Sequence, residues 1–385
     1  MNERGIIAEP ANVHLMGKRL LCLSAAVAIL AAAPATSAAP TAGGLASDNV
    51  DYVSTVPFEA GAALTGARLV GDYFYVAGVR SFSIYDVTDP LAPALESITP
   101  TGPQFPNEDV DTNGKILLVS NQQLGGTLEV YNVEDKAAPA RLAKMENIRD
   151  HTFTCVLRCR YAYGAGGSII DLRDPARPRL AGNWSVFGPQ NGFDTTEISP
   201  GRVLTATPSI QLLDGRKDPT RPFTVAQGAN PDNRLIHSVR WPNGGRERFF
   251  LVQGETPFSQ KCETDSGAFM TWDTRGYSKT RTFRMADEYR VVNGTVTDGN
   301  PPANAAGCTT MWFQEHPDYR NGGVVAAAFF EHGTRFLSVD PRGKIREEGF
   351  FLPLGGETIA VYWVTDEIVY AIDVTRGIDI LRYES

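Results

Sequence analysis

The sequence predicts an all-β protein: a seven-bladed β-propeller whose blades are four-stranded antiparallel sheets, with an N-terminal strand closing the last blade. Two observations lead to this prediction. A short strand-like segment recurs seven times at a spacing of about 44 residues, which is the length of four short strands with their turns. A turn that begins with Asp and ends with Pro follows the next strand in each of the first four copies.

The recurring segments are the second strands of the predicted blades. They are short, rich in Val, Ile, Tyr and Phe, and separated by Gly and Pro, which is typical of strands and not of helices. The segments begin, in chain order, at Asp72, Lys115, Arg160, Arg202, Arg248, Gly323 and Glu367. One spacing is longer than the others, because a polar insertion falls there. A four-stranded sheet of this size cannot bury both faces alone, so the copies must pack together, and a closed ring leaves only short edges.

The turn after the third strand carries a fixed pattern in the early copies. Asp89, Asp174 and Asp218 each begin the sequence D-P-x-x-P, and Asp135 begins D-K-x-x-P. An Asp side chain in this position accepts hydrogen bonds from the N–H groups of the turn, and proline cannot donate to a strand ladder. The pattern therefore indicates where each third strand stops.

The two ends of the chain are expected to complete the ring. The seventh copy runs out at Ser385, directly after its third strand, and leaves no residues for a fourth. The segment NVDYVSTVPF, residues 49–58, precedes the first copy as an unassigned strand. We therefore expect residues 49–58 to supply the outer strand of the last blade, and residues 49–385 to form one propeller domain.

The third strands also carry a resemblance to a known family. The segments FSIYD (82–86) and LEVYN (128–132), each followed by the D-x-x-x-P turn, resemble bacterial LVIVD-repeat β-propellers. The similarity covers roughly residues 64–225, and the later copies keep the Asp but lose the second Pro. That family is defined by its architecture, so the resemblance implies a propeller and no particular activity.

The N-terminal segment reads as a Sec-type signal peptide. Lys18 and Arg19 precede an apolar stretch at 20–33, and small residues follow it. We expect cleavage after Ala38, so that residues 1–38 are removed, with Met16 as an alternative start of translation, and residues 39–48 form a linker. The mature protein would be secreted or periplasmic. No other segment approaches about 18 apolar residues, so we expect no membrane span.

The cysteines that follow the signal peptide are even in number, which in an exported chain favours disulfides. CVLRC places Cys155 and Cys159 across a hairpin turn, so we pair them, and Cys262 then pairs with Cys308. Free buried thiols are the alternative. A zinc site is less favoured, because the C-x3-C spacing has no matching second pair.

Composition and motifs argue against several classes of function. The formal net charge of -8 and the lack of a Lys and Arg cluster argue against a nucleic-acid partner. The chain contains no G-x-S-x-G elbow, no P-loop and no H-E-x-x-H motif. We assign Trp241, Trp272, Trp312 and Trp363 to packing. We expect a monomer.

Propeller geometry predicts a ring of polar residues at one end of the central channel. In each blade the innermost strand begins at one rim, and the link between the second and third strands returns to it. Counting back from the turn after each innermost strand, and adding these links, gives the candidate ligand-binding residues Glu108, His151, Asp194, His237, Glu255, Glu331, His332 and Glu357. The long segments that carry Cys262 and Cys308 belong to the same rim, where a disulfide between them would hold a lid over the channel.

Three interpretations of this ring stay open. The side chains line a wet channel and satisfy one another; or they bind a small polar ligand; or they bind a divalent metal, with His151 and His237 as ligands and Asp194 or Glu108 as a ligand or general base. The leading hypothesis for function is an exported binding module that engages a protein or a small polar ligand at this rim. The alternative is a metal-dependent hydrolase or oxidoreductase with an axial site of His and carboxylate groups.

Overall fold

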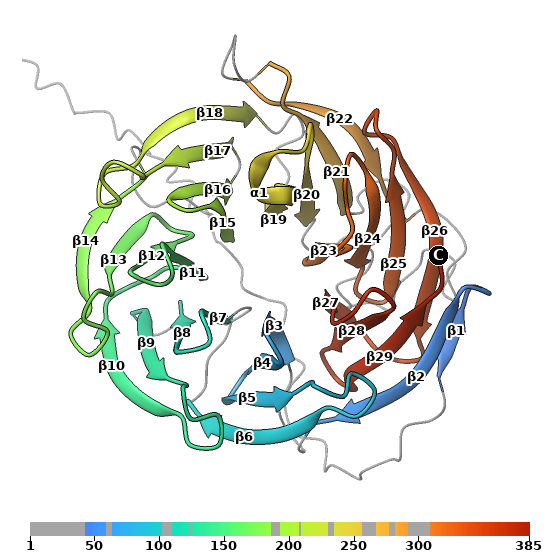
Figure 1. Ribbon diagram of the computed structural model, residues 1–385, viewed down its shortest axis with the longest axis horizontal. Coiled ribbons are helices and arrows are strands. Elements are labelled where there is room, and N and C mark those ends of the chain that lie inside the picture. Colours follow the sequence, from blue (N-terminus) through green and yellow to red (C-terminus); the bar gives the residue numbers. More distant parts are fainter. Residues whose placement is uncertain are drawn as a thin grey trace, which may run out of the picture. The chain divides into compact units, whose positions relative to one another are not determined.

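Seven antiparallel sheets stand side by side in a ring, with their first strands toward the middle (Figure 1). The structure is a computed structural model that describes residues 43–58, 64–101, 110–122, 125–185, 193–207, 209–229, 235–255, 267–276, 282–291 and 309–385. It confirms the predicted seven-bladed β-propeller. The predicted signal peptide, Glu108, Cys262 and Cys308 lie outside the described residues.

The first four blades each use four consecutive strands, from the innermost to the outermost. Blade 1 contains β3 (Leu64–Val70), β4 (Tyr73–Gly78), β5 (Ser81–Asp86) and β6 (Ala94–Pro100). Blade 2 contains β7 (Val110–Thr112), β8 (Ile116–Asn121), β9 (Thr127–Asn132) and β10 (Ala140–Glu146). Blade 3 contains β11 (Phe153–Val156), β12 (Tyr161–Gly164), β13 (Ser168–Asp171) and β14 (Arg179–Asn183). Blade 4 contains β15 (Asp194–Ser199), β16 (Arg202–Ala206), β17 (Ser209–Asp214) and β18 (Phe223–Ala229).

The last three blades include a short helix and the N-terminal strands. Blade 5 contains β19 (Leu235–Arg240), β20 (Phe249–Glu255), β21 (Ala268–Asp273) and β22 (Arg284–Tyr289), with α1 (Pro242–Gly245) between its first two strands. Blade 6 contains β23 (Phe313–Glu315), β24 (Gly323–Ala328), β25 (Thr334–Val339) and β26 (Ile345–Pro353), joined at its edge by β1 (Gly44–Ala46). Blade 7 contains β27 (Thr358–Trp363), β28 (Ile368–Asp373) and β29 (Gly377–Tyr383), and its outermost strand is β2 (Val50–Pro57).

The N-terminal strand closes the ring as the sequence predicts. β2 pairs antiparallel with β29, with Val50 opposite Tyr383 and Pro57 opposite Gly377. The preceding residues depart from the predicted linker, because β1 pairs antiparallel with β26 and extends blade 6 to five strands. The first two strands therefore join the edges of two neighbouring blades (Figure 1).

The Asp residues of the predicted turns have the role that their pattern indicates. The Oδ1 atom of each accepts a hydrogen bond from the backbone N–H group two residues later, at 3.0 Å for Asp89, 3.1 Å for Asp135, 3.3 Å for Asp174 and 2.9 Å for Asp218. This bond satisfies a donor that the end of the strand would leave unpaired.

The apolar core lies between the blades. Among the described residues there are seven apolar clusters, one at each interface between neighbouring blades. Adjacent residues of a second strand serve different interfaces: Phe74 belongs to the cluster between blades 7 and 1, and Tyr75 to the cluster between blades 1 and 2. Because successive side chains of a strand point to opposite faces, a blade buried on both sides needs a continuous apolar run.

The hairpin of blade 3 contains the predicted disulfide. Cys155 in β11 is bonded to Cys159 in the turn before β12. Leu157, Arg158 and Cys159 all have positive φ angles, of 54°, 59° and 57°. Three successive residues other than glycine in the left-handed region store conformational energy, which the surrounding hairpin and the disulfide must offset.

The described part of the chain includes no helix with the length and hydropathy that a membrane crossing requires.

Candidate functional site

The described candidate residues occupy one rim of the ring, as the counting predicts. His151, Asp194 and Glu357 lie at or just before the beginnings of innermost strands, and His237 is the third residue of β19. Glu255, Glu331 and His332 lie at or just after the ends of second strands. We call this side the insertion rim, because two long connections, from β20 to β21 and from β22 to β23, begin and end on it. The opposite side, where the innermost strands end, is the turn rim.

Four rings make consecutive contacts from blade 3 to blade 6. The ring centroid of Phe193 lies 5.0 Å from that of His151 and 5.3 Å from that of His237. The centroids of His237 and Trp312 are 5.2 Å apart. The aromatic ring of Phe193 thus contacts both of the imidazoles that the metal hypothesis pairs.

The described residues provide no ready set of metal ligands. Within the ranges that the structure covers, no three His, Cys, Asp or Glu side chains form a group that could hold a metal ion. His151 has a contact of its own, with its Nδ1 atom 2.9 Å from Oε1 of Gln122. Glu108, a carboxylate of the predicted set, lies outside the described residues.

Acidic side chains of blades 6 and 7 come together on the insertion rim. Phe330 and Thr358 exchange two backbone hydrogen bonds, of 2.8 and 2.9 Å, which tie the link of blade 6 to the beginning of β27. Burial and the charge of Glu357 raise the pKa of Glu331 to about 7. Burial and the charge of Asp373 raise the pKa of Glu357. This part of the rim therefore loses negative charge as the pH falls below neutral.

The pKa of the neighbouring His332 imidazole shifts in the opposite direction. The imidazole is fully buried, and burial together with the charge of Arg335 lowers its pKa to about 4. His332 is therefore neutral at neutral pH, while its neighbour Glu331 is partly protonated.

A cavity of about 270 Å³ lies among the innermost strands. Every blade contributes to its wall, and the lining residues are Ala67, Arg68, Leu69, Val70, Asp111, Thr112, Thr154, Asp194, Thr195, Thr196, Ser238, Arg240, Trp312, Phe313, Gln314 and Tyr362. Of the predicted site residues that the structure describes, Asp194 alone is among them. In blades 1, 2 and 5 the wall includes the last residues of the innermost strands, Val70, Thr112 and Arg240, so the cavity extends beyond the insertion rim toward the turn rim.

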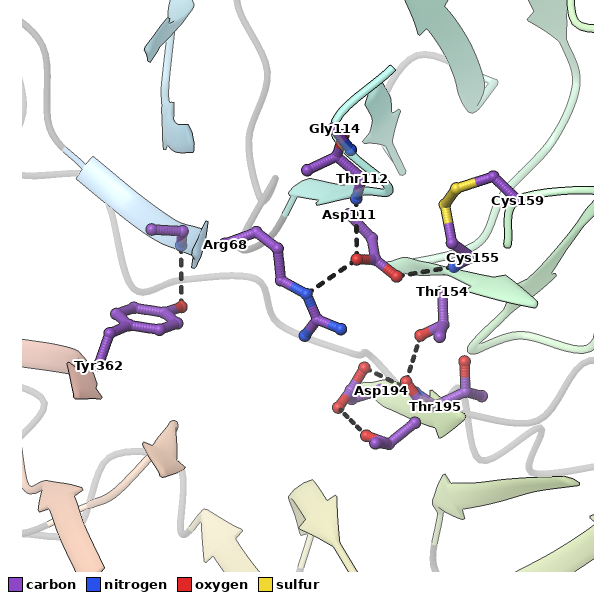
Figure 2. Close-up of polar contacts among 12 residues, drawn as sticks. Arg68, Asp111, Thr112, Gly114, Thr154, Cys155, Cys159, Asp194, Thr195 and Tyr362 are labelled. Atoms are coloured by element: carbon purple, nitrogen blue, oxygen red, sulfur yellow. Dashed lines mark hydrogen bonds and ion pairs between the residues drawn. A yellow bond between two sulfur atoms is a disulfide. The ribbon is translucent and has the colours of Figure 1, made fainter. Parts of the chain in front are cut away.

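Two guanidinium groups in the wall are each matched by a carboxylate. Nε of Arg68 lies 3.0 Å from Oδ1 of Asp111. Asp111 also accepts hydrogen bonds from the backbone N–H groups of Thr112, at 2.8 Å, and Cys155, at 2.7 Å (Figure 2). Arg240 forms an ion pair with Glu315, in which Nη2 lies 3.2 Å from Oε1.

Asp194, the second acidic residue of the wall, forms no ion pair with a described residue. Asp194 is 4% exposed and accepts hydrogen bonds from the backbone N–H group of Thr195, at 2.7 Å, and from the hydroxyl group of Thr196, at 3.3 Å (Figure 2). Burial raises the pKa of Asp194 to about 7, although the neighbouring His237 and Arg68 act in the opposite direction. The carboxylate is thus close to changing its charge at neutral pH.

Most residues of the cavity were missed by reasoning from the sequence. Arg68, Asp111 and Arg240 lie further along the innermost strands than the counted positions. The sequence feature that could have identified them is a charged residue inside an otherwise apolar strand, as in ARLV and SVRW. All four tryptophans pack at interfaces between blades, as predicted, and Trp312, which packs against the cluster between blades 7 and 1, also lines the cavity.

Comparison with known proteins supports the fold alone. No family model matches the chain, and no curated protein matches it. Among solved structures, the WD40 β-propeller domain of Doa1 is similar, with a TM-score of 0.58 and 11% sequence identity over 88% of this chain and 98% of that one. At this identity the similarity shows a propeller and carries no function with it. The resemblance to LVIVD-repeat propellers stays a prediction.

Proposed function

We propose that this chain is an exported β-propeller of the LVIVD-repeat type that binds a protein partner through its insertion rim. The observation that carries the proposal is the position of the two longest connections. The connections over residues 256–267, in blade 5, and 290–312, between blades 5 and 6, both begin and end on this rim. Elsewhere the longest connections between second and third strands are 122–126 and 329–333, and the longest between blades is 184–193. Extended connections on a rigid scaffold are where proteins of this architecture place recognition.

The charge of the described rim favours a particular kind of partner. Glu255, Glu331 and Glu357 add carboxyl groups to this side of the ring, and the negative charge of Glu331 becomes complete only above about pH 7. Complementary potentials steer association and suppress wrong partners. A basic surface on the partner protein is therefore expected.

Export is supported by residues 1–38, whose basic, apolar and small-residue regions follow one another in the order of a signal peptide. Sequencing the N-terminus of the protein purified from the extracellular or periplasmic fraction is expected to begin at Ala39. Recovery of only the uncleaved chain from the cytoplasm would contradict export.

Site-specific photo-crosslinking tests the binding surface. A crosslinking amino acid in place of Leu354, which is 53% exposed in the connection before β27, reports on the insertion rim. The matched control replaces Leu91, which is 40% exposed in a turn on the turn rim. We expect adducts with a protein from Leu354 and not from Leu91.

Shortening residues 256–266 to a Gly-Ser linker should remove the adduct from Leu354 and leave the melting temperature unchanged. Adducts from Leu91 alone, equal adducts from both positions, or none from either would each contradict the proposal.

A further inference from the structure

The charges in the wall of the cavity do not balance. Arg68 lies against Asp111, and Arg240 lies against Glu315, so each positive group has its own negative neighbour. Asp194 is the remaining charged group of the wall. Among the described residues no ion pair includes it. His237 and Arg68 act on its charge without forming an ion pair with it, so ionising this buried carboxylate stays costly.

The surroundings of Asp194 compensate its charge only in part. One backbone N–H group and one hydroxyl group donate to it. An ionised carboxylate has about four lone-pair sites that can accept, so acceptor capacity is left over. This carboxylate, with acceptor capacity left over, lies in the wall of a cavity, where a ligand can approach it.

We propose that this cavity binds a small organic cation with a primary ammonium group, and that the carboxylate of Asp194 is its counter-ion. The site is separate from the protein partner proposed for the insertion rim, and either can exist without the other.

The wall offers an ammonium group more than one acceptor. The hydroxyl groups of Thr154 and Thr196 lie in the same wall as Asp194. An ammonium group has three donors and no acceptor, which suits a wall of carboxylate and hydroxyl oxygens. The rings of Trp312 and Tyr362 complete the wall on the side of blades 6 and 7, and aromatic faces attract cations.

The size of the cavity limits the ligand. Its volume of about 270 Å³ is just below the range of about 300–1,000 Å³ that is typical of sites for drug-sized molecules. A short aliphatic or aromatic amine is therefore the expected class, and a peptide is too large.

The wall of the cavity suits an anionic ligand less well than a cationic one. Both guanidinium groups are already paired, so a carboxylate ligand would have to compete with Asp111 or Glu315. It would also enter a wall that carries Asp194. Separating a buried ion pair leaves one charge unpaired, which is costly.

Three probes of similar size separate these possibilities. Calorimetric titration of the purified full-length mature chain would compare butylammonium, tetramethylammonium and butyrate at constant ionic strength. We expect butylammonium to bind most tightly, tetramethylammonium more weakly because it has no N–H donor, and butyrate least. Tightest binding of butyrate, or no binding of butylammonium, would overturn the proposal.

A matched pair of variants locates the site. Asp194→Asn keeps the shape of the side chain and removes its charge, and it should weaken butylammonium binding by about tenfold or more. Glu331→Gln removes a carboxyl group on the insertion rim that does not line the cavity, and it should leave the affinity unchanged. Equal affinities of Asp194→Asn and the parent chain would overturn the proposal. If Asp194→Asn does not fold, Thr196→Val and the order of the three probes on the parent chain decide the question.

Discussion

Val50 lies directly opposite Tyr383, so that a strand near the beginning of the described chain pairs with the last strand of the ring. Both side chains are buried in the apolar cluster between blades 6 and 7. The ring is therefore closed by strand pairing and side-chain packing between the two ends of the propeller, and nothing covalent joins them at this point.

Deletion of residues 49–58 should destabilise the whole ring. It removes β2, leaves β29 as an open edge, and uncovers the apolar side chains that Val50 and its neighbours cover. We expect the melting temperature to fall by at least about 5 °C in differential scanning calorimetry. Deletion of residues 39–46, which removes only β1 at the edge of blade 6, is the comparison and should have a smaller effect.

Two substitutions in the same strand test the packing more finely. Val50 is 3% exposed and Val53 is 37% exposed. We expect Val50→Asp to lower the free energy of unfolding by about 3 kcal/mol or more, because it buries an unpaired charge, and Val53→Asp to change it by less than about 0.5 kcal/mol. Urea unfolding curves measure both, and similar losses for the two variants would show that the strand is not packed as described.

Glu331→Gln should alter how stability depends on pH. The pKa of Glu331 is about 7 in the fold against 4.5 ordinarily, so the folded chain holds a proton that the unfolded chain loses between these values. Its stabilising effect is complete below pH 4.5 and is lost as the pH rises through 7. Above pH 7 we expect the variant to be more stable than the parent by about 1–2 kcal/mol, after allowance for solvent screening. Unfolding free energies measured at pH 5 and pH 8 test this, and a difference independent of pH would refute it.

Substitution of the neighbouring histidine should act in the opposite direction. The pKa of His332 is about 4 in the fold against 6.5 ordinarily, so the unfolded chain takes up a proton as the pH falls below 6.5 and the folded chain does not. The parent chain therefore loses up to about 3 kcal/mol from this group between pH 6.5 and 4. In His332→Gln this part of the acid sensitivity should disappear, whatever the variant's stability at pH 8. A slope of stability against pH that matches the parent would count against a buried, neutral His332.

Removal of the blade 3 disulfide should have a modest effect. Cys155 and Cys159 close a very short loop, for which the chain-entropy model gives about 2 kcal/mol. We expect the double variant Cys155→Ala, Cys159→Ala to lose about this amount in urea unfolding at neutral pH. A loss much larger than this would mean that the hairpin of blade 3 depends on the bond to fold.

The fold could be predicted because each blade repeats the same local requirement. Both faces of the second strand are buried, so its runs, such as YFYVA and ILLV, are continuously apolar and easy to align. The closing role of residues 49–58 followed from the missing outer strand of the last copy. β1 gave no such signal, because three residues with the sequence GLA, mostly exposed, have no periodicity to detect.

The candidate site could be predicted only in part, because the innermost strands are irregular. The pairing register shifts between Leu64 and Gly66 in β3, and between Ile236 and Ser238 in β19. Thr65 and His237 are therefore the extra residues of β-bulges, which redirect the side chains that follow. Counting back from a turn finds the rim correctly, but it cannot tell which later residues, such as Arg68, face the cavity.

The pairing of β2 with β29 also constrains how the protein can fold. In chain order β2 precedes all the other described blade strands except β1, and β29 follows them. During translation β2 has no partner, and the first blades assemble as an open arc with an exposed apolar face at each end. Contacts of such large sequence separation form slowly, so closure of the ring is expected to be a late event in folding. Incomplete chains are therefore the species most exposed to aggregation.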